Sequence, residues 1–185
     1  YKDKSQEISN ILEKVIKKSF PKLKIEQLHG SRDYFQMIYE KTLFEIVPII
    51  KIEDSSEALN ITDISPLHAE WVNDRGEILK DDIRLAKQFC KAQKLYGAES
   101  YLSSFSGYVL EILIIYYGSF DNLLKQSTKW KSPVIVDPEN YYYKNMVMFE
   151  LNNSKLQSPI IIVDPVDKNR NAAAALSLEK FDKFK

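Results

Sequence analysis

The stretch that decides the fold is Ser106–Tyr117, SGYVLEILIIYY, which is apolar on nearly every side. A helix of this kind is typical of the centre of a core, so we predict a buried helix. Its β-branched residues make a buried strand the alternative. Its longest apolar run, Val109–Tyr117, contains Glu111 and is shorter than the ~20 residues that cross a bilayer. The stretch therefore predicts a soluble globular protein with a helical core and no membrane segment.

Composition sets the outer bounds. The chain has 185 residues, 44% of them hydrophobic, which suffices for a sizeable core in one or two domains. The net charge is zero, so any surface for nucleic acid must be a local patch. One cysteine, Cys90, excludes an internal disulfide, and a cytoplasmic location is the simplest interpretation. The chain begins Tyr-Lys-Asp-Lys without Met or signal peptide, so we expect it to come from something longer.

Around the central stretch, the second half alternates helical and strand patterns. Periodic apolar residues predict three further helices: Leu79–Lys94, Phe120–Trp130, and a last one from about Asn171 to the end. Short β-branched runs between turn residues predict three strands: Val134–Val136, Met146–Phe149 and Ile160–Val163.

The first 60 residues predict a helix and a hairpin. The helix is indicated by apolar residues at helical spacing ahead of Pro21. Tyr34–Tyr39 and Leu43–Ile50 are rich in aromatic and β-branched residues and join through Glu40-Lys41-Thr42, so we predict an antiparallel hairpin. The polar stretch Glu53–Ser65 is typical of a linker. We therefore predict an α+β architecture with a boundary near residue 60.

Glu45 lies inside the second predicted strand. Alternation along that strand places it on the face of Leu43, Val47 and Ile49. A carboxylate among apolar neighbours is costly unless it is paired or binds a metal. The alternative is an edge-strand glutamate facing water, since Pro48 also indicates an edge.

A basic stripe runs along the helix predicted over Leu79–Lys94. Its residues are spaced four or three apart, so they share one face: Lys80, Arg84, Lys87, Lys91 and Lys94. Such a stripe on a neutral protein suits a phosphate backbone. A solvated helix face is the alternative, and Asp81 and Asp82 dilute the stripe at its start.

No common catalytic motif stands out. His29 and His68 have no Cys or His at ligand spacing, so no zinc site is indicated. Gly30-Ser31-Arg32 resembles a fragment of a phosphate-binding loop, but no second glycine follows. The residues alone thus predict a soluble α/β protein with a basic helix.

Four stretches combine uncommon residues at set spacings. The first is Phe44-Glu45-Ile46-Val47-Pro48, and the second is Asp63-Ile64-Ser65-Pro66-Leu67-His68. The third comprises Arg84, Lys87, Tyr96-Gly97-Ala98-Glu99, Phe105-Ser106-Gly107-Tyr108, Glu111, Tyr117-Gly118-Ser119-Phe120 and Trp130. The fourth is Val163-Asp164-Pro165-Val166-Asp167 with Arg170-Asn171 and Ala173-Ala174. In this order, the four resemble the archaeal-type (class I) CCA-adding enzymes, which are tRNA nucleotidyltransferases.

The resemblance implies a polymerase-β-type nucleotidyltransferase. Residues 1–60 would be the C-terminal part of its palm domain, and residues 61–185 its mainly helical central domain. The implied reaction is attack of the tRNA 3′-hydroxyl on the α-phosphate of CTP or ATP, assisted by Mg²⁺ ions held by three carboxylates. The implied partners are tRNA, ATP and CTP.

The resemblance also implies roles for single residues. Glu45 matches the third carboxylate, usually Asp, and would be catalytic and a metal ligand. His68, Lys87 and Tyr96 match positions that hold the incoming triphosphate, where cations clamp the leaving pyrophosphate. Arg170 matches the arginine that helps read the incoming base.

The chain departs from the family in two motifs. It has no Asp-x-Asp, the pair that supplies the family's first two carboxylates, and Ser103-Ser104 replaces a basic-Gly pair. We therefore expect the chain alone to be inactive, as a fragment of the enzyme or as one half of a split enzyme whose complementary chain carries the N-terminal catalytic segment. The alternatives are a non-catalytic tRNA- or nucleotide-binding remnant, and another template-independent RNA nucleotidyltransferase, such as a poly(A) or oligoadenylate synthase.

The resemblance requires distant residues to converge. We expect His68, Lys87 and Tyr96 to line one cleft facing Glu45. Arg170 should lie on its rim, beside the N-terminal amides of the last helix. The alternative is that Tyr96 is a core aromatic and His68 a surface residue.

Overall fold

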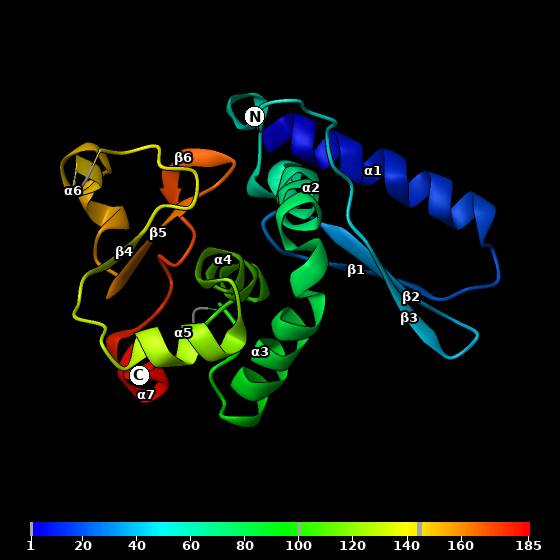
Figure 1. The fold of residues 1–185 in the computed structure, drawn as a ribbon. Coiled ribbons are helices and arrows are strands. Elements are labelled where there is room, and N and C mark those ends of the chain that lie inside the picture. The colour runs from blue at the N-terminus through cyan, green and yellow to red at the C-terminus, as the bar shows by residue number, and fades with distance from the viewer. Residues whose placement is uncertain (1, 100, 144–145) are drawn as a thin grey trace. The chain divides into compact units, whose positions relative to one another are not determined.

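Residues 2–99, 101–143 and 146–185 are described by a computed structural model, with side chains from Glu7 onward. The architecture is α+β, as predicted, and the chain divides into two compact units, one up to Leu67 and one from His68 (Figure 1). The sequence predicts the domain boundary near residue 60, within the polar stretch Glu53–Ser65 that precedes Leu67. That the two units are palm and central domain stays a prediction.

The first unit is one helix on a small sheet. The predicted helix is α1 (Lys2–Ser19). The sheet is antiparallel with strand order β1-β2-β3, formed by Ile25–Leu28, Tyr34–Tyr39 and Thr42–Ile46. Ile16 of α1 packs with Phe35 and Met37 of β2 in the core of this unit. The sequence missed β1, because four residues with a polar middle carry little pattern.

The predicted hairpin is confirmed, but its second strand is shorter. Glu40 and Lys41 both have positive φ, 47° and 64°, and Tyr39 pairs with Thr42, as in a two-residue hairpin turn. β3 ends at Ile46 rather than Ile50. Beyond it, the carbonyl of Pro48 accepts from the Arg32 guanidinium and the N–H of Ile50 donates to Asp63. These side chains occupy backbone groups that a longer strand would use for its ladder.

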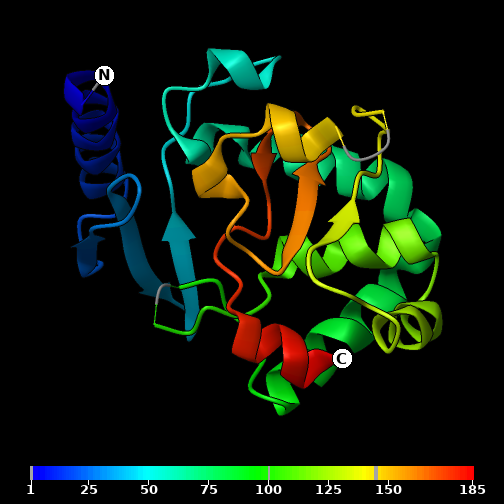
Figure 2. The same cartoon turned by 90° about the vertical axis from the view of Figure 1, so that its left-hand side faces the viewer.

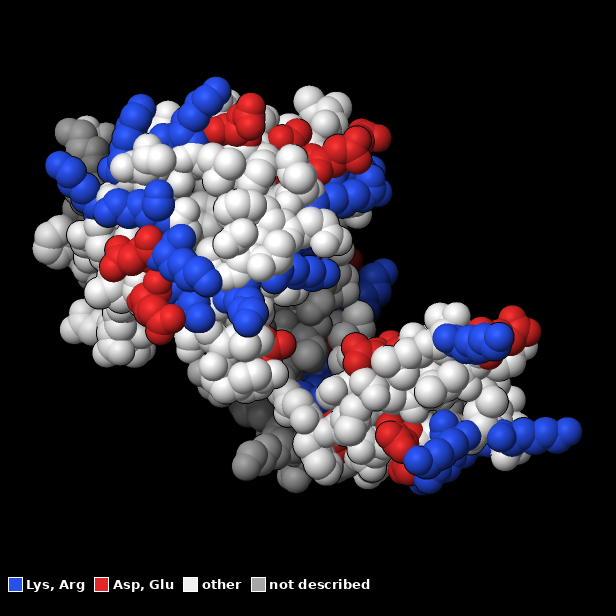
Figure 3. Space-filling model, turned by 90° about the horizontal axis from the view of Figure 1, so that it is seen from below, with Lys and Arg blue, Asp and Glu red and all other residues white. Residues whose placement is uncertain are grey.

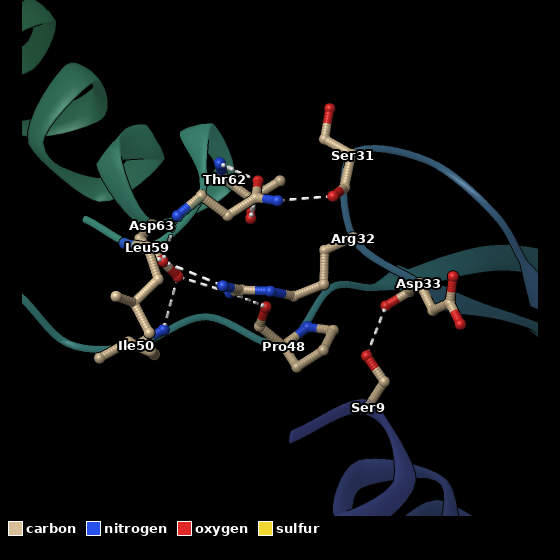
Figure 4. A network of polar contacts seen from close by, with 10 residues as sticks. Ser9, Ser31, Arg32, Asp33, Pro48, Ile50, Leu59, Thr62 and Asp63 are labelled. Atoms are coloured by element: carbon tan, nitrogen blue, oxygen red, sulfur yellow. Dashed lines mark hydrogen bonds and ion pairs between the residues drawn. The ribbon is translucent and has the colours of Figure 1, made fainter. Parts of the chain in front are cut away.

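The stretch predicted to be a linker is part of the first unit. It contains two short 3₁₀ helices, η1 (Ser55–Glu57) and η2 (Ile61–Ile64), and a capping box between Asn60 and Asp63. The Asp63 side chain is fully buried and ion-paired with Arg32 (Figure 4). This buried carboxylate ties the polar stretch to the loop before β2.

The second unit is mainly helical with a three-stranded sheet. Its helices are α2 (Ser65–Gly76, which begins before the boundary), η3 (Glu77–Leu79), α3 (Lys80–Ala92), α4 (Gly107–Tyr117), α5 (Phe120–Ser127), α6 (Val147–Glu150), η5 (Asn153–Lys155) and α7 (Leu178–Phe184). Its strands are β4 (Val134–Val136), β5 (Ile160–Asp164) and β6 (Asp167–Asn171). β4 and β5 are parallel and β5 and β6 antiparallel; Figure 2 shows the three side by side in yellow to orange-red.

The centre of this unit is α4, the helix that the apolar stretch predicts. Five of its residues are at most 2% exposed: Val109, Leu110, Ile112, Leu113 and Ile114. Ser106 caps its N-terminus through a hydrogen bond from Val109 N, and Gly118 ends it in the left-handed region at φ 78°. Among the described residues, no helix is both long and apolar enough to cross a bilayer.

Two element predictions are wrong. Met146–Phe149, predicted as a strand, lies at the start of α6. Val147 and Leu151 are buried whereas Phe149 is exposed, which is a spacing of four and therefore helical. The last helix does not begin near Asn171, which belongs to β6; α7 begins at Leu178, after the cap Ser177. The Asn171 side chain accepts from Ile162 N and Ala173 N and so holds this segment beside β5.

Two helices keep their predicted start within one residue and end early. The helix predicted over Leu79–Lys94 is α3, which ends at Ala92, and that predicted over Phe120–Trp130 is α5, which ends at Ser127. The strands predicted at Val134–Val136 and Ile160–Val163 are confirmed.

Candidate functional site

A buried carboxylate at the end of β5 gathers side chains from three other elements. Asp164 is 0% exposed. It accepts hydrogen bonds from His68 Nε2 at 3.1 Å, from the Tyr108 hydroxyl at 3.0 Å and from Val166 N at 3.0 Å. The Arg170 guanidinium also donates to it. Two predicted site residues, His68 and Arg170, thus meet at one carboxylate.

Electrostatics keep Asp164 ionised. Burial alone would raise its pKa, but hydrogen bonds from His68 and Val166 and the charge interactions with His68 and Arg170 hold the pKa below its ordinary value. The Tyr108 ring stacks on the His68 ring at 4.0 Å. Burial and the neighbouring Asp164 raise the pKa of Tyr108 far above its ordinary value, so its hydroxyl stays protonated and donates.

A second group joins the other two predicted residues. Lys87 Nζ lies 2.6 Å from a carboxylate oxygen of Glu111, with 27% and 21% of these side chains exposed. A Cβ on Gly107 would lie 2.8 Å from the Tyr96 hydroxyl and 3.6 Å from Lys87 Cε. Lys87 and Tyr96 therefore both approach the first residue of α4, where a glycine leaves room for them.

The first turn of α4 connects the two groups. Gly107 faces Lys87 and Tyr96, Tyr108 contacts His68 and Asp164, and Glu111 pairs with Lys87. Residues three or four apart on a helix are neighbours. The four predicted nucleotide-binding residues thus gather around this turn: His68, Lys87, Tyr96 and Arg170. Tyr96 is partly buried and packs against the hydrophobic core of this unit, as in the core-aromatic alternative, and His68 is partly buried as well.

One detail of the expected arrangement is wrong. Arg170 was expected beside the N-terminal amides of the last helix, but it lies in β6, and α7 begins eight residues later. Its guanidinium is held by Asp164 instead.

Glu45 belongs to the first unit. It lies on the edge strand β3, is exposed, and accepts a hydrogen bond from Gln36, its partner on β2. This is the geometry of the edge-strand alternative. Its role as catalytic residue and metal ligand stays a prediction.

A complete Mg²⁺ site is not formed by the described part of the chain. Within residues 2–99, 101–143 and 146–185, no three His, Cys, Asp or Glu side chains come close enough to hold a metal ion. Mg²⁺ requires six oxygen ligands in near-octahedral geometry. A single exposed carboxylate such as Glu45 does not fit it alone.

The basic stripe is interrupted in the structure. α3 ends at Ala92, and Lys94 follows with a left-handed φ of 57°, so Lys94 is outside the helix face that the other four share. Arg84 pairs with Asp81 at 2.9 Å, and the Lys91 ammonium lies 4.9 Å from the centre of the Tyr96 ring. Figure 3 shows basic side chains with acidic ones among them on the face seen from below. Of the stripe residues, Arg84, Lys87 and Lys91 thus each interact with a neighbouring side chain.

Sequence reasoning assigned no role to the residues that organise this site. Asp164, Tyr108, Glu111 and Gly107 all occur in the motifs that carry the family resemblance, so a signal was present. Their function as partners of the cations could not be found from spacing, because the partners are distant in sequence.

Comparisons with known proteins agree with the motifs. The family described as "tRNA nucleotidyltransferase, second domain" matches residues 81–185. A CCA-adding enzyme of Nanoarchaeum equitans is 47% identical over 182 residues, which are 97% of this chain and 46% of that protein. CCA-adding enzymes of Picrophilus torridus and Methanosarcina mazei are 37% and 36% identical, over 92% and 86% of this chain and 41% and 33% of theirs. The chain spans less than half the length of these relatives.

Proposed function

Because this chain belongs to the tRNA nucleotidyltransferase family, whose second domain matches residues 81–185, we propose that it is part of an enzyme that completes the 3′ end of tRNA. The resemblance to archaeal-type CCA-adding enzymes is confirmed, with the chain spanning 33–46% of the relatives. The proposed reaction transfers CMP and AMP from CTP and ATP to the tRNA 3′-hydroxyl.

The observation that carries the proposal is the gathering of His68, Lys87, Tyr96 and Arg170 around the first turn of α4. The set contains two permanent cations, an imidazole and a tyrosine, which suits a nucleoside triphosphate. In the proposal, Lys87 and His68 hold the triphosphate and stabilise the charge that develops on the leaving pyrophosphate. Tyr96 lies beside them, and the planar guanidinium of Arg170 contacts the base.

The two carboxylates keep these cations in place before the nucleotide binds. Glu111 accepts a hydrogen bond from Lys87, and Asp164 accepts hydrogen bonds from His68 and Arg170. A phosphate oxygen can replace the Glu111 carboxylate as partner of Lys87, because both are anionic acceptors. Lys87 thus exchanges its ion pair with Glu111 for an ion pair with a phosphate when the nucleotide binds.

Metal chemistry would need further ligands. Mg²⁺ supplies stabilisation of the attacking and leaving oxygens in reactions of this class. Glu45 is proposed as one of its ligands, completed by carboxylates of a complementary chain that carries the N-terminal catalytic segment. We derive no step through the metal from this chain alone.

Exposed cations are proposed to contact tRNA. Lys80, Arg84, Lys91 and Lys94 lie on α3 or just past its end and would bind phosphates of the RNA backbone. A non-catalytic tRNA- or nucleotide-binding protein is the second candidate function. The sequence observation in its favour is that the chain contains no Asp-x-Asp.

Calorimetric titration of the chain with ATP and CTP tests the proposed nucleotide site. We expect Lys87→Ala to weaken binding about tenfold or more, since a charged hydrogen bond contributes about 1.5–3 kcal/mol. Lys129→Ala, an exposed lysine beyond α5, is the matched control and should bind as the unaltered chain does. Failure of the unaltered chain to bind either nucleotide would refute the site.

A further inference from the structure

Asp164 is not one of the proposed nucleotide-binding residues, although two of them, His68 and Arg170, donate hydrogen bonds to it. His68 comes from α2 and lies 96 residues before Asp164, whereas Arg170 comes from β6. Both donate to the same oxygen, Oδ2, while the Tyr108 hydroxyl and Val166 N donate to Oδ1. Each carboxylate oxygen therefore accepts two hydrogen bonds, and His68 and Arg170 share the same oxygen.

Such an arrangement is costly to bury. Asp164 is 0% exposed, whereas His68 and Arg170 keep 14% and 29% of their side chains exposed. Removing a carboxylate from water costs several kcal/mol, and an apolar group of similar size is often no less stabilising than a buried ion pair. Stability alone is thus a weak reason for this carboxylate, while orienting two partly exposed donors is a specific one.

We propose that Asp164 is a positioning residue of the nucleotide site, whose carboxylate orients the His68 ring and the Arg170 guanidinium toward the ligand. Because His68 Nε2–H donates to Asp164, Nδ1 is the other ring nitrogen, and it donates to a phosphate oxygen when the imidazole is protonated. Stacking on Tyr108 at 4.0 Å sets the plane of the same ring. This inference rests on the proposed function, since it concerns the same pocket.

Charge and positioning predict opposite results when the carboxylate is removed. A negative charge beside a triphosphate site repels the ligand. If Asp164 only offset the charge of Arg170, Asp164→Asn would release that cation and tighten binding of ATP. If it positions His68 and Arg170, the same variant weakens binding even though the site becomes more positive.

The experiment is an ATP titration of the unaltered chain, Asp164→Asn and Asp164→Ala, each checked for folding by circular dichroism. We expect ATP to bind Asp164→Asn about tenfold more weakly and Asp164→Ala at least as weakly, because a charged hydrogen bond is worth about 1.5–3 kcal/mol. Asp121→Asn, which changes an exposed acid in the first turn of α5, is the control, and binding should change less than about twofold.

A ring readout separates orientation from stability. The chain has two histidines, so His29→Gln assigns the imidazole signals in nitrogen-15 NMR spectra. We expect the His68 Nε2–H signal to be protected from exchange in the unaltered chain and to lose that protection in Asp164→Ala. Retained protection in folded Asp164→Ala would mean that Asp164 does not hold the ring, and would overturn the positioning role.

The outcomes are distinct. Unchanged or tighter ATP binding by folded Asp164→Asn would overturn the positioning role while leaving the nucleotide site intact. If that variant does not fold, Tyr108→Phe decides, since it removes one donor to Asp164 and keeps the charge; it should weaken ATP binding several-fold, and unchanged binding would overturn the role. Absence of ATP binding to the unaltered chain would overturn the proposed function and this inference together.

Discussion

Arg32 is the residue on which the first unit most depends. Its guanidinium donates to both oxygens of Asp63 and to the carbonyl of Pro48, and neither ionic side chain is exposed. Figure 4 shows the guanidinium lying between the Pro48 and Asp63 segments, which come from different parts of the chain. The Arg32 side chain therefore helps to hold the segment after β3, although the strand itself ends at Ile46.

We predict that Arg32→Ala lowers the free energy of unfolding by about 3–5 kcal/mol, because it leaves Asp63 buried without its counter-ion. Urea denaturation followed by circular dichroism measures the change. Lys17→Ala, which removes only an exposed pair with Glu13, is the control and should cost less than about 1 kcal/mol. A comparable loss in the two variants would mean that the buried pair is not structurally important.

Acid should destabilise the same network. Burial would raise the pKa of Asp63, but hydrogen bonds from Arg32, Ile50 N and Asn60 N and the Arg32 charge hold that pKa below its ordinary value. A carboxyl whose folded pKa is lowered stabilises the fold above its unfolded pKa, and that stability is lost as pH falls through the folded pKa. We therefore expect stability to be constant from pH 7 to 5 and to decline below about pH 4. Denaturation series of the unaltered chain and Asp63→Asn test this, since the variant should show a flatter acid limb.

At the scale of elements, α4 joins the structural core to the candidate site. Its buried residues hold the unit together, while Gly107, Tyr108 and Glu111 in its first turn approach the four candidate residues. The same helix thus contributes to the core of the unit and to the geometry of the candidate site. Substitutions at its first residue can separate the two.

We predict that Gly107→Ala weakens ATP binding about tenfold while the unit stays folded. The new Cβ would lie 2.8 Å from the Tyr96 hydroxyl, so the tyrosine must move, whereas alanine is a better helix former than glycine. ATP titration and thermal melting measure the two effects. Gly30→Ala, whose Cβ would make ordinary contacts, serves as control; equal ATP affinity in both variants would argue against the pocket at this turn.

α3 is the element that the sequence singled out for RNA. Lys80 and Lys94 are both exposed, and neither contacts the candidate nucleotide residues in the hydrogen bonds and ion pairs of the described residues. We predict that changing both to Gln weakens tRNA binding and flattens the log–log salt dependence by about 0.7–0.9 for each phosphate that is no longer neutralised. Binding measured from low to moderate salt, with Lys129→Gln and Lys131→Gln as paired control, tests this. An unaltered slope would support the solvated-face alternative.

At the scale of the whole molecule, we expect catalysis to require more than this chain supplies. The described residues contain no cluster suited to a metal ion, and the sequence contains no Asp-x-Asp. We predict no incorporation of CMP or AMP by the pure chain into tRNA that lacks its CCA end. Labelled-nucleotide assays measure this directly, and robust incorporation would contradict it.

A positive control for that assay uses a complementary polypeptide. Addition of a polypeptide that carries the N-terminal catalytic segment should restore incorporation, and Glu45→Ala should abolish it again. Glu57→Ala, an exposed acid of the same unit, is the matched control and should leave restored activity unchanged. Restored activity that survives Glu45→Ala would remove Glu45 from the metal site.

The sequence by itself determined the elements whose signal is local. The apolar stretch of α4 predicts a buried helix because no exposed face is available to it, and the alternation of the β2–β3 hairpin predicts its pairing. The family motifs predicted four nucleotide-binding residues, a role that stays a prediction, and the structure brings these four around one helical turn. For α6 and β6 the local pattern misled, because tertiary packing and the Asn171 hydrogen bonds outweighed weak intrinsic preferences.

The tertiary structure alone decided which charges are partners. Arg32 meets Asp63 and His68 meets Asp164 across 31 and 96 residues, and no periodicity of the chain relates them. The physical reason is that a buried carboxylate must find donors wherever packing brings them, and packing depends on the whole core. The sequence therefore determined which side chains could act, and the fold determined which of them each carboxylate holds in place.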